Sequence, residues 1–355
     1  MNRLPSWSRT RPAAAVLLSM GLLVAACGST GSSSAPPASS APTAAASASG
    51  GADLGAPEKT DLKIGYRTND AGNPAAIMIA IEKGYFKDEG LTVEPVLIDD
   101  VDAALIGGSL DLAIFDPDGS ANHINEGVPI RMVAGWRDKE AMIIFAGKGI
   151  NTVADLAGKD VALGLGAGDP ATKIRTDALK AAGWDLESAN VNFVNPPGFS
   201  NARIQLLLEG KLAMTYGFPR HRAQVTDAGG KIIVDELNEE MSDVVIAKQD
   251  FIDANQNTLA RTFRALIKAK DFLLDPNNKD AVIEIVKKYD VPAEPKDIEP
   301  WDAQLVIHSQ NLSLPEANLD ENLRLADVQN PGFDKLTDLR ALRAAWAAMG
   351  ITPPQ

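Results

Sequence analysis

Apolar residues follow two different spacings along the chain from about residue 61 onward. Short, nearly continuous apolar runs, such as 62–66 and 110–115, are typical of buried strands. Longer runs with apolar residues three and four positions apart, such as 74–86 and 171–182, are typical of helices packed on a sheet. The pattern predicts further strands at 91–98, 130–136, 141–146, 161–165, 191–194, 212–216 and 231–234, and further helices at 201–209, 259–274, 279–289, 297–311 and 334–349. Strands that alternate with helices of this length predict an α/β fold with βαβ units and parallel sheets.

A weak internal repeat divides this pattern into two halves. Gly108 and Gly210 each end a predicted helix and precede a predicted strand, in the sequences GSLDL and GKLAM. Upstream of them, Asn73 and Asp169 are each followed by proline, a combination that starts helices. The two motifs occur in the same order in both halves and therefore predict two similar α/β lobes. Ligands of open α/β sheets bind outside the carboxyl ends of the strands, so the loops there are expected to border a cleft.

The first 26 residues have the pattern of an export signal. Arg3, Arg9 and Arg11 precede an uninterrupted run of small and apolar residues over 13–26, which is shorter than the roughly 20 residues needed to cross a bilayer. The run ends at Cys27, in the sequence LVAAC, which resembles the bacterial lipobox. The resemblance implies a signal peptide over 1–26 and a lipid on Cys27. We therefore expect a lipid-anchored protein on the extracytoplasmic face of the cell membrane, with the lipid as its sole anchor.

Composition adds a tether and excludes some partners. Residues 28–52 contain no charged side chain and consist only of Gly, Ser, Ala, Pro and Thr, so 27–60 is expected to be a flexible linker. The chain has a formal net charge of −13, which argues against nucleic acid or an anionic bilayer surface as a direct partner. Its single cysteine excludes an intrachain disulfide.

Three stretches resemble motifs of the substrate-binding lipoproteins of ABC importers in the nitrate, sulfonate, taurine and thiamine-pyrimidine-precursor class. They are AIEKGYFKDEGL at 80–91, GSLDLA at 108–113 and VADLAGKDV at 153–161. The resemblance implies the type II periplasmic-binding-protein fold, with two lobes, a ligand cleft between them and a helical C-terminal extension. It places the first lobe at 61–145 plus 243–355 and the second at 146–242. It also implies an ABC permease and its ATPase as partners, and a monomer that captures a small molecule.

Acidic side chains are candidates for ligand contact where strands end and helices begin. Asp116 and Asp118 follow an apolar strand, and Asp169 starts the first helix of the second lobe, although all three fit ordinary turn and capping roles as well. Many anion-binding relatives have Ser or Thr where Asp169 stands, and a carboxylate there would repel an anion from the helix N-terminus. The acidic loops therefore favour a neutral or cationic ligand with N–H donors. The candidate ligand-binding residues are Asn69, Asp70, Asn73, Asp116, Asp118, Trp136, Asp169, Thr172, Tyr216 and Phe218.

Aromatic residues suggest a planar, nitrogen-containing ligand. Trp136, Tyr216 and Phe218 lie at the ends of predicted strands, where their rings would stack on a flat molecule, although core packing is the alternative for Trp136. An arginine inside the cleft, such as Arg137 or Arg203, would instead suit a nitrate, sulfonate or carboxylate ligand.

An enzyme of the same fold and a sensor that signals to a membrane kinase are further alternatives. The three histidines are far apart and none has the spacing of metal ligands. The sequence contains no nucleophile motif, no phosphate-binding loop and no cofactor motif. These observations favour a binding protein without catalytic residues, metal or cofactor.

Overall fold

The computed structural model describes residues 54–67, 73–197, 200–291, 303 and 306–353. All of these belong to one compact unit, Ser49–Gln355. The expected signal peptide, Cys27 and most of the expected linker lie outside the described residues, as do the candidate ligand residues Asn69 and Asp70. Within the described part, no helix has the length and apolar character needed to cross a membrane.

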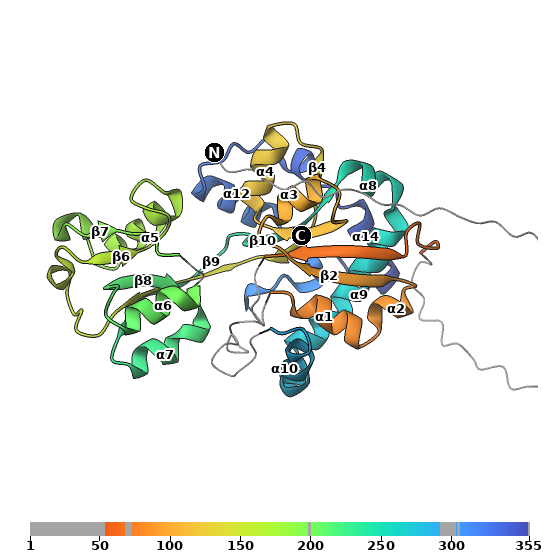
Figure 1. The fold of residues 1–355 in the computed structure, drawn as a ribbon. Coiled ribbons are helices and arrows are strands. Elements are labelled where there is room, and N and C mark those ends of the chain that lie inside the picture. Colours follow the sequence, from red (N-terminus) through yellow and green to blue (C-terminus); the bar gives the residue numbers. More distant parts are fainter. Residues whose placement is uncertain (1–53, 68–72, 198–199, 292–302, 304–305, 354–355) are drawn as a thin grey trace, which may run out of the picture. The chain divides into compact units, whose positions relative to one another are not determined.

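The first of two sheets has five strands in the order β2-β1-β3-β10-β4 (Figure 1). Strand β1 pairs in parallel with β2 and β3, whereas β10 is antiparallel to both β3 and β4. All four residues of β3 are buried, as its unbroken apolar sequence predicts for a central strand. The strands of the first sheet and the helices between them, up to β4, are β1 Asp61–Tyr66, α1 Ala75–Glu82, α2 Tyr85–Asp88, β2 Thr92–Leu97, α3 Val101–Ile106, β3 Leu112–Phe115, α4 Pro117–Asn125 and β4 Ile130–Arg137.

The second sheet repeats this plan in the order β7-β6-β8-β5-β9. Strand β6 pairs in parallel with β7 and β8, and β5 is antiparallel to β8 and β9. The repeat seen in the sequence therefore corresponds to two sheets of the same topology. The elements of this sheet are β5 Glu140–Ala146, η1 Val153–Leu156, β6 Asp160–Ala162, α5 Pro170–Ala181, η2 Leu186–Ala189, β7 Asn192–Phe193, α6 Ser200–Leu208, β8 Met214–Gly217, η3 Pro219–His221, α7 Arg222–Asp227 and β9 Lys231–Asn238.

Two chain segments cross between the sheets, at residues 138–139 and 239–242. Strand β5 was expected in the first lobe, which was placed at 61–145, but it pairs with strands of the second sheet. Only two residues separate β4 from β5, and β5 pairs with β8 and β9 instead of folding back on β4. We therefore use "second lobe" for residues 140–238 and "first lobe" for the described residues on either side of this range and of the two crossings.

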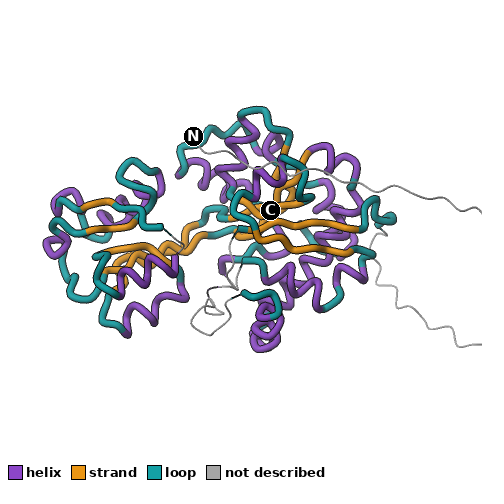
Figure 2. Tube along the Cα trace, viewed as in Figure 1, coloured by secondary structure: helices purple, strands orange, loops and turns teal. Residues whose placement is uncertain are grey.

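The C-terminal region is helical and covers the first sheet (Figure 2). The longest helix, α9, packs against α1 and α14 and buries one side in the core. The helix expected over 334–349 is divided, because Thr337 has an extended backbone and forms a bridge with Met132 of β4. The elements of this region are β10 Asp243–Lys248, α8 Gln249–Ala254, α9 Gln256–Leu274, η4 Pro276–Asn278, α10 Lys279–Lys287, η6 Gln310–Leu312, α12 Glu316–Leu325, α13 Phe333–Leu336 and α14 Arg340–Met349.

Most of the helix expected at 297–311 falls on residues 297–302 and 304–305, which lie outside the described residues, and its described positions 303, 306 and 307 are helical. Asn311 inside η6 has a left-handed backbone with φ 54°. A left-handed residue cannot continue a right-handed helix, so the chain turns here before α12.

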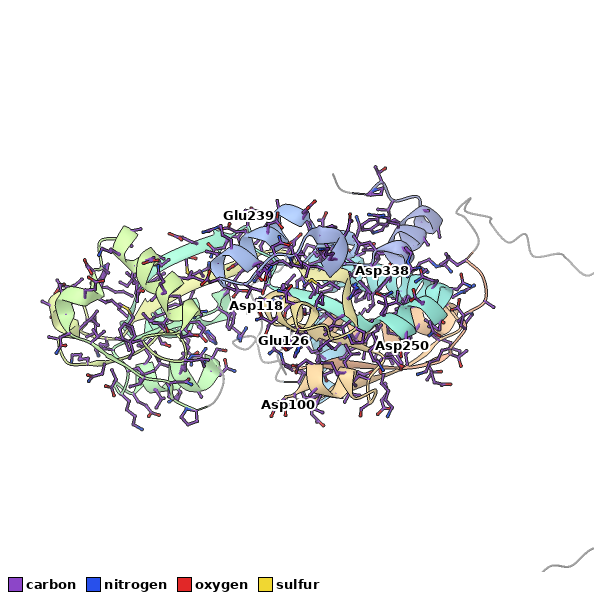
Figure 3. All side chains as sticks on the ribbon, turned by 90° about the horizontal axis from the view of Figure 1, so that it is seen from above. Asp100, Asp118, Glu126, Glu239, Asp250 and Asp338 are labelled. Atoms are coloured by element: carbon purple, nitrogen blue, oxygen red, sulfur yellow. The ribbon has the colours of Figure 1, made fainter. Side chains whose placement is uncertain are left out.

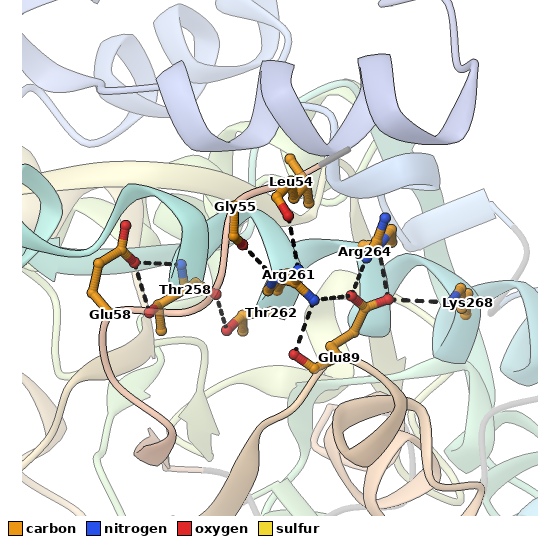
Figure 4. Close-up of polar contacts among 9 residues, drawn as sticks. All are labelled: Leu54, Gly55, Glu58, Glu89, Thr258, Arg261, Thr262, Arg264 and Lys268. Atoms are coloured by element: carbon orange, nitrogen blue, oxygen red, sulfur yellow. Dashed lines mark hydrogen bonds and ion pairs between the residues drawn. The ribbon is translucent and has the colours of Figure 1, made fainter. Parts of the chain in front are cut away.

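The chain that precedes β1 is held on helix α9 (Figure 4). Arg261 donates to the carbonyls of Leu54 and Gly55, both at 2.8 Å, and Glu58 accepts from the backbone nitrogens of Asn257 and Thr258 at 3.1 and 2.8 Å. Glu58 thus satisfies free N–H groups at the start of α9. Residues 54–60 were expected to belong to the flexible linker, and the structure corrects this, because they dock on the first lobe.

Beside this contact, a buried carboxylate joins the first βα unit to α9. Glu89 is 2% exposed and is paired with Arg264, with Arg261 at 3.5 Å and with Lys268 at 3.3 Å (Figure 4). The Nε of Arg264 donates to one carboxylate oxygen at 2.7 Å and its terminal nitrogen donates to the other. Two parallel bonds of this kind fix orientation as well as charge.

Candidate ligand-binding site

A cavity of about 400 Å³ lies where the two lobes meet the crossing segments. Its lining combines helices of the first lobe, strands and a helix of the second lobe, and the second crossing. The polar lining residues are Asp118, Asn122, Glu140, Asp169, Arg175, Tyr216, Asn238, Glu240 and Asn322. The remaining lining residues are Ala141, Met142, Ile143, Ala171, Ile174, Gly217, Leu325, Ala326 and Val328.

The fold brings these residues together at strand ends, as the sequence predicts. Asp118 is in the first turn of α4, directly after β3, and Tyr216 is near the end of β8. Glu140 begins β5 and Glu240 lies in the second crossing. Figure 3 shows Asp118 on the side of the first lobe nearest the crossings, whereas Asp250 lies toward its far end. Of the expected acidic residues, Asp118 and Asp169 line the cavity.

Asp169 occupies the N-terminus of α5. One of its carboxylate oxygens, Oδ2, accepts from the backbone nitrogens of Leu165 and Thr172, both at 3.1 Å, and from the hydroxyl of Thr172 at 3.3 Å. Gly164 makes room for this arrangement, since a Cβ there would lie 2.1 Å from Asp169 Oδ2. A carboxylate of the chain itself thus sits where a free anion would bind, and the predicted capping role of Asp169 is confirmed.

Glu240 is the acid whose ionisation the cavity perturbs most. Burial and then the neighbouring charge of Glu140 raise its pKa to about 7. The Nδ2 of Asn238 donates to it at 3.4 Å, and the charge of Arg175 lowers the pKa in part. No ion pair joins Glu240 or Asp118 to another residue in the described part of the chain. Both carboxylates are therefore available to a ligand.

The family model described as NMT1/THI5 like matches residues 71–279. The chain belongs to the NMT1/THI5-like family. The match confirms the predicted resemblance to nitrate-, sulfonate- and thiamine-precursor-binding proteins. A search of curated protein sequences found no match.

Solved structures confirm the fold of this NMT1/THI5-like chain. A protein from Bordetella bronchiseptica RB50 has a TM-score of 0.62 at 20% identity, over 83% of this chain and 99% of that one. The periplasmic nitrate-binding protein NrtA from Synechocystis PCC 6803 has a TM-score of 0.58 at 16% identity, over 83% and 90%. The periplasmic aliphatic sulphonate-binding protein SsuA from Escherichia coli has a TM-score of 0.55 at 16% identity, over 76% and 86%. The type II periplasmic-binding-protein fold, with its helical C-terminal region, is thereby confirmed.

Two of the three expected aromatic contacts lie outside the cavity of this NMT1/THI5-like protein. Trp136 is 1% exposed, and its Nε1 donates to the backbone and side-chain oxygens of Asn73 at 3.1 and 3.0 Å. Asn73, expected to cap α1, therefore serves to hold Trp136 inside the first lobe, while Pro74 takes the position before α1. Phe218 lies beside Arg220 rather than against the cavity.

Tyr216 does line the cavity, but both faces of its ring are covered. The guanidinium carbon of Arg175 lies 3.6 Å from the ring centre and that of Arg203 lies 4.2 Å from it. Two planar guanidinium groups cannot both approach so closely on one face, so each takes a different face. Arg175 also donates to the carbonyl of Leu163 at 2.7 Å. The ring is accordingly held in a cation–π stack.

The remaining expected residues have structural contacts. Asp116 precedes α4 and pairs with Arg67 outside the cavity lining. Thr172 is 1% exposed and acts through its bonds to Asp169. The sequence interpretation missed Glu140, Arg175 and Asn238 together with Glu240 and Asn322. The signal for Glu140, Asn238 and Glu240 was their position beside the crossings, which a boundary at 145 obscured. Arg175 in α5 and Asn322 in α12 had no such local signal.

The side chains that line the cavity are carboxylates, amides, one arginine, one tyrosine and apolar groups. Its lining contains no His, Ser, Thr or Cys among the described residues. Within the same part of the chain, no cluster of His, Cys, Asp and Glu could hold a metal ion. Hydrogen-bond acceptors dominate its polar surface, and its other side is aliphatic.

Proposed function

We propose that this protein is the extracytoplasmic solute-binding receptor of an ABC importer. Membership of the NMT1/THI5-like family supports this function, as do structural neighbours described as periplasmic nitrate- and sulphonate-binding proteins. The ligand would enter the cavity between the lobes, and rotation about the two crossings would enclose it. A membrane permease driven by an ATPase would then take up the ligand from the closed form. The receptor would act as a monomer, held at the membrane by a lipid on Cys27.

The proposal for the ligand depends on which carboxylates in the cavity have ion-pair partners. Asp118 and Glu240 have no ion-pair partner among the described residues, while Asp169 fills the N-terminus of α5. Arg175 is the one cationic lining residue in the described part of the chain, and it is bound to Leu163 and stacked on Tyr216. We therefore favour a neutral or cationic small molecule with N–H donors over nitrate or a sulfonate.

A thermal-shift screen followed by calorimetry tests the receptor function. A ligand at 100 times its Kd should stabilise the folded protein by about 2.7 kcal/mol, and its heat of binding should saturate at one equivalent without turnover. The screen should contain amines, aminopyrimidines, nitrate and taurine. Tight binding of nitrate or taurine would support the alternative of an anion receptor. Conversion of any bound compound to a product would contradict the receptor function and favour an enzyme.

Replacement of Cys27 tests the anchor separately. The Cys27→Ala variant should appear in the soluble extracytoplasmic fraction with its ligand affinity unchanged, because the lipid and the cavity are independent. A variant that stays on the membrane after a high-salt wash would contradict lipid anchoring.

A further inference from the structure

We propose that the ligand is an aliphatic ammonium compound, held by its N–H donors and its methylene groups, and not a planar heterocycle. This inference rests on the proposed receptor function and narrows the class of ligand. It follows from three features of the cavity: free acceptors, an aliphatic wall and the absence of an available ring face on Tyr216.

The free acceptors come from three different elements that border the cavity. Asp118 belongs to α4, Glu240 to the second crossing and Asn322 to α12. The Oδ1 of Asn322 is buried without a hydrogen-bond donor in the described part of the chain. A buried carbonyl oxygen without a donor is costly, so a ligand N–H would satisfy a group that the protein leaves unsatisfied. An ammonium group offers three donors and a positive charge, which suits several acceptors at once.

The wall between these acceptors is aliphatic. Met142 and Ile143 from β5 and Ile174 from α5 line the second-lobe side, and Leu325 and Val328 line the first-lobe side. Methylene groups gain free energy by contact with such a surface, roughly in proportion to the apolar area that they bury. A chain of methylenes with an amine at its end therefore matches both parts of the lining.

A planar aromatic ligand would find no exposed aromatic face in the cavity on which to stack. Stacking requires an exposed aromatic face, but Arg175 and Arg203 cover Tyr216 on both sides. Trp136 is closed inside the first lobe. Arg175 is the one of the two arginines that also lines the cavity, so it covers the face of the Tyr216 ring on which a ligand could otherwise stack. Arg175 thereby becomes a specificity-determining residue, which excludes aromatic ligands by occupying the stacking position.

The test compares four small probes by calorimetry on the full-length protein. They are 1,4-diaminobutane, its uncharged counterpart 1,4-butanediol, the planar 4-amino-2-methylpyrimidine, and ethanesulfonate, an anion without an ammonium group. We expect saturable binding of the diamine at one equivalent and binding of the diol that is at least about 100-fold weaker, since the diol lacks the charge-assisted bonds. Glu240→Gln should weaken diamine binding about tenfold or more. Glu239→Gln is the matched control, because Glu239 is adjacent, pairs with Lys139 at 2.6 Å and does not line the cavity.

A second variant tests the exclusion of rings. Arg175→Met should uncover the cavity-facing side of Tyr216 and increase the affinity for the aminopyrimidine about tenfold relative to the diamine. Two outcomes would overturn the inference: no binding of the diamine, or unchanged diamine affinity in Glu240→Gln. If the aminopyrimidine or ethanesulfonate binds to the unmodified protein instead, the ammonium class is wrong while the receptor function stands. If neither these probes nor the broader screen gives a ligand, both the ammonium class and the receptor function are contradicted.

Discussion

The carboxylate of Asp169 accepts hydrogen bonds from both the backbone nitrogen and the hydroxyl of Thr172. The helix N-terminus that could bind an anionic ligand is therefore already neutralised from within the chain. Related folds described as binding nitrate or sulphonates can thus differ from this protein in ligand charge without any change in architecture.

Asp169→Ser should reverse this preference at small cost to folding. A serine hydroxyl can still accept from the nitrogen of Thr172, so we expect the free energy of unfolding to fall by less than about 1 kcal/mol. Loss of the carboxylate should weaken binding of a cationic ligand about tenfold and allow weak binding of nitrate, both measurable by calorimetry. Asp185→Ser is the control, because Asp185 caps η2 outside the cavity. Nitrate binding to the unmodified protein, undiminished in Asp169→Ser, would contradict the role of Asp169.

Glu240 should make both stability and ligand binding depend on pH. Its pKa in the folded protein is about 7, above the value of an exposed glutamate, because of burial and then the charge of Glu140. The folded state therefore holds a proton that the unfolded state has lost, and the free energy of unfolding should fall as pH rises from about 4.5 to 7. Arg175 and Glu321 act on the same group with opposite signs. Ammonium binding requires the ionised carboxylate, so affinity should increase between pH 6 and pH 8.

Urea denaturation and calorimetry at pH 6, 7 and 8 measure these two dependences. In Glu240→Gln, the free energy of unfolding and the ligand affinity should both depend less on pH. The variant should also be more stable than the original protein at pH 8 by about 1 kcal/mol. Asp243, whose pKa burial also raises to about 7, remains in both proteins, so the difference between them isolates Glu240. Equal pH profiles for the two proteins would show that Glu240 is already ionised at low pH.

Lys270 should make the free energy of unfolding rise with pH, which is opposite to the effect of Glu240. It is fully buried in the first lobe, donates to the carbonyl of Trp136, and lies 4.5 Å from the ring centre of that residue. Burial lowers its pKa to about 7, despite the opposing charge of Asp138. The unfolded state then binds the extra proton, so the free energy of unfolding should rise between pH 7 and pH 9.

Lys270→Met tests this effect with little change in volume. The carbonyl of Trp136 keeps the nitrogen of Ser309 as a donor at 3.2 Å, so no acceptor is left without a partner. We expect the variant to be at least as stable as the original at pH 7 and to lose the rise toward pH 9. Both are read from urea denaturation. A loss of more than about 2 kcal/mol at pH 7 would mean that the ammonium group contributes net stability.

Glu89 should be far more important for folding than an exposed glutamate. Glu89→Gln would leave Arg261, Arg264 and Lys268 around a neutral amide, and loss of one partner from a buried charge cluster costs about 3–5 kcal/mol. Glu94→Gln is the control, since Glu94 is exposed and pairs only weakly with Lys63 at 3.4 Å, so its loss should cost less than about 1 kcal/mol. Equal denaturation midpoints for the two variants would contradict this difference.

Local signals predicted the elements better than they predicted side-chain contacts. Asp169 was correctly expected to cap a helix, because the cap and its proline are neighbours in the sequence. Trp136 was expected at the cleft because it ends a predicted strand, but the end of a strand does not show which residues cover its side chain. Its partner Asn73 is 63 positions away, and Lys270 is 134 positions away. Contacts over such separations leave no trace in local periodicity.

The local sequence pattern did not predict the boundaries of the lobes either. The apolar run at 141–146 predicts a strand correctly, but only pairing with β8 and β9 assigns it to the second sheet. Glu140 and Glu240 line the cavity because β5 belongs to the second sheet. In the same way, residues 54–60 have the polar composition of a linker, and their order depends on bonds to Arg261 and Thr258 about 200 positions later.

The docking of residues 54–58 on α9 also determines where tension on the N-terminal side of the chain would be resisted. A pull applied upstream of Leu54 would first load the bonds that Arg261 and Glu58 make to that segment and to the start of α9. Several bonds would have to break before force reached the end of β1, so the sheet would be protected from peeling. The second lobe is joined to this anchor point only through the two crossings. It would carry none of the load and could rotate freely while the chain was under tension.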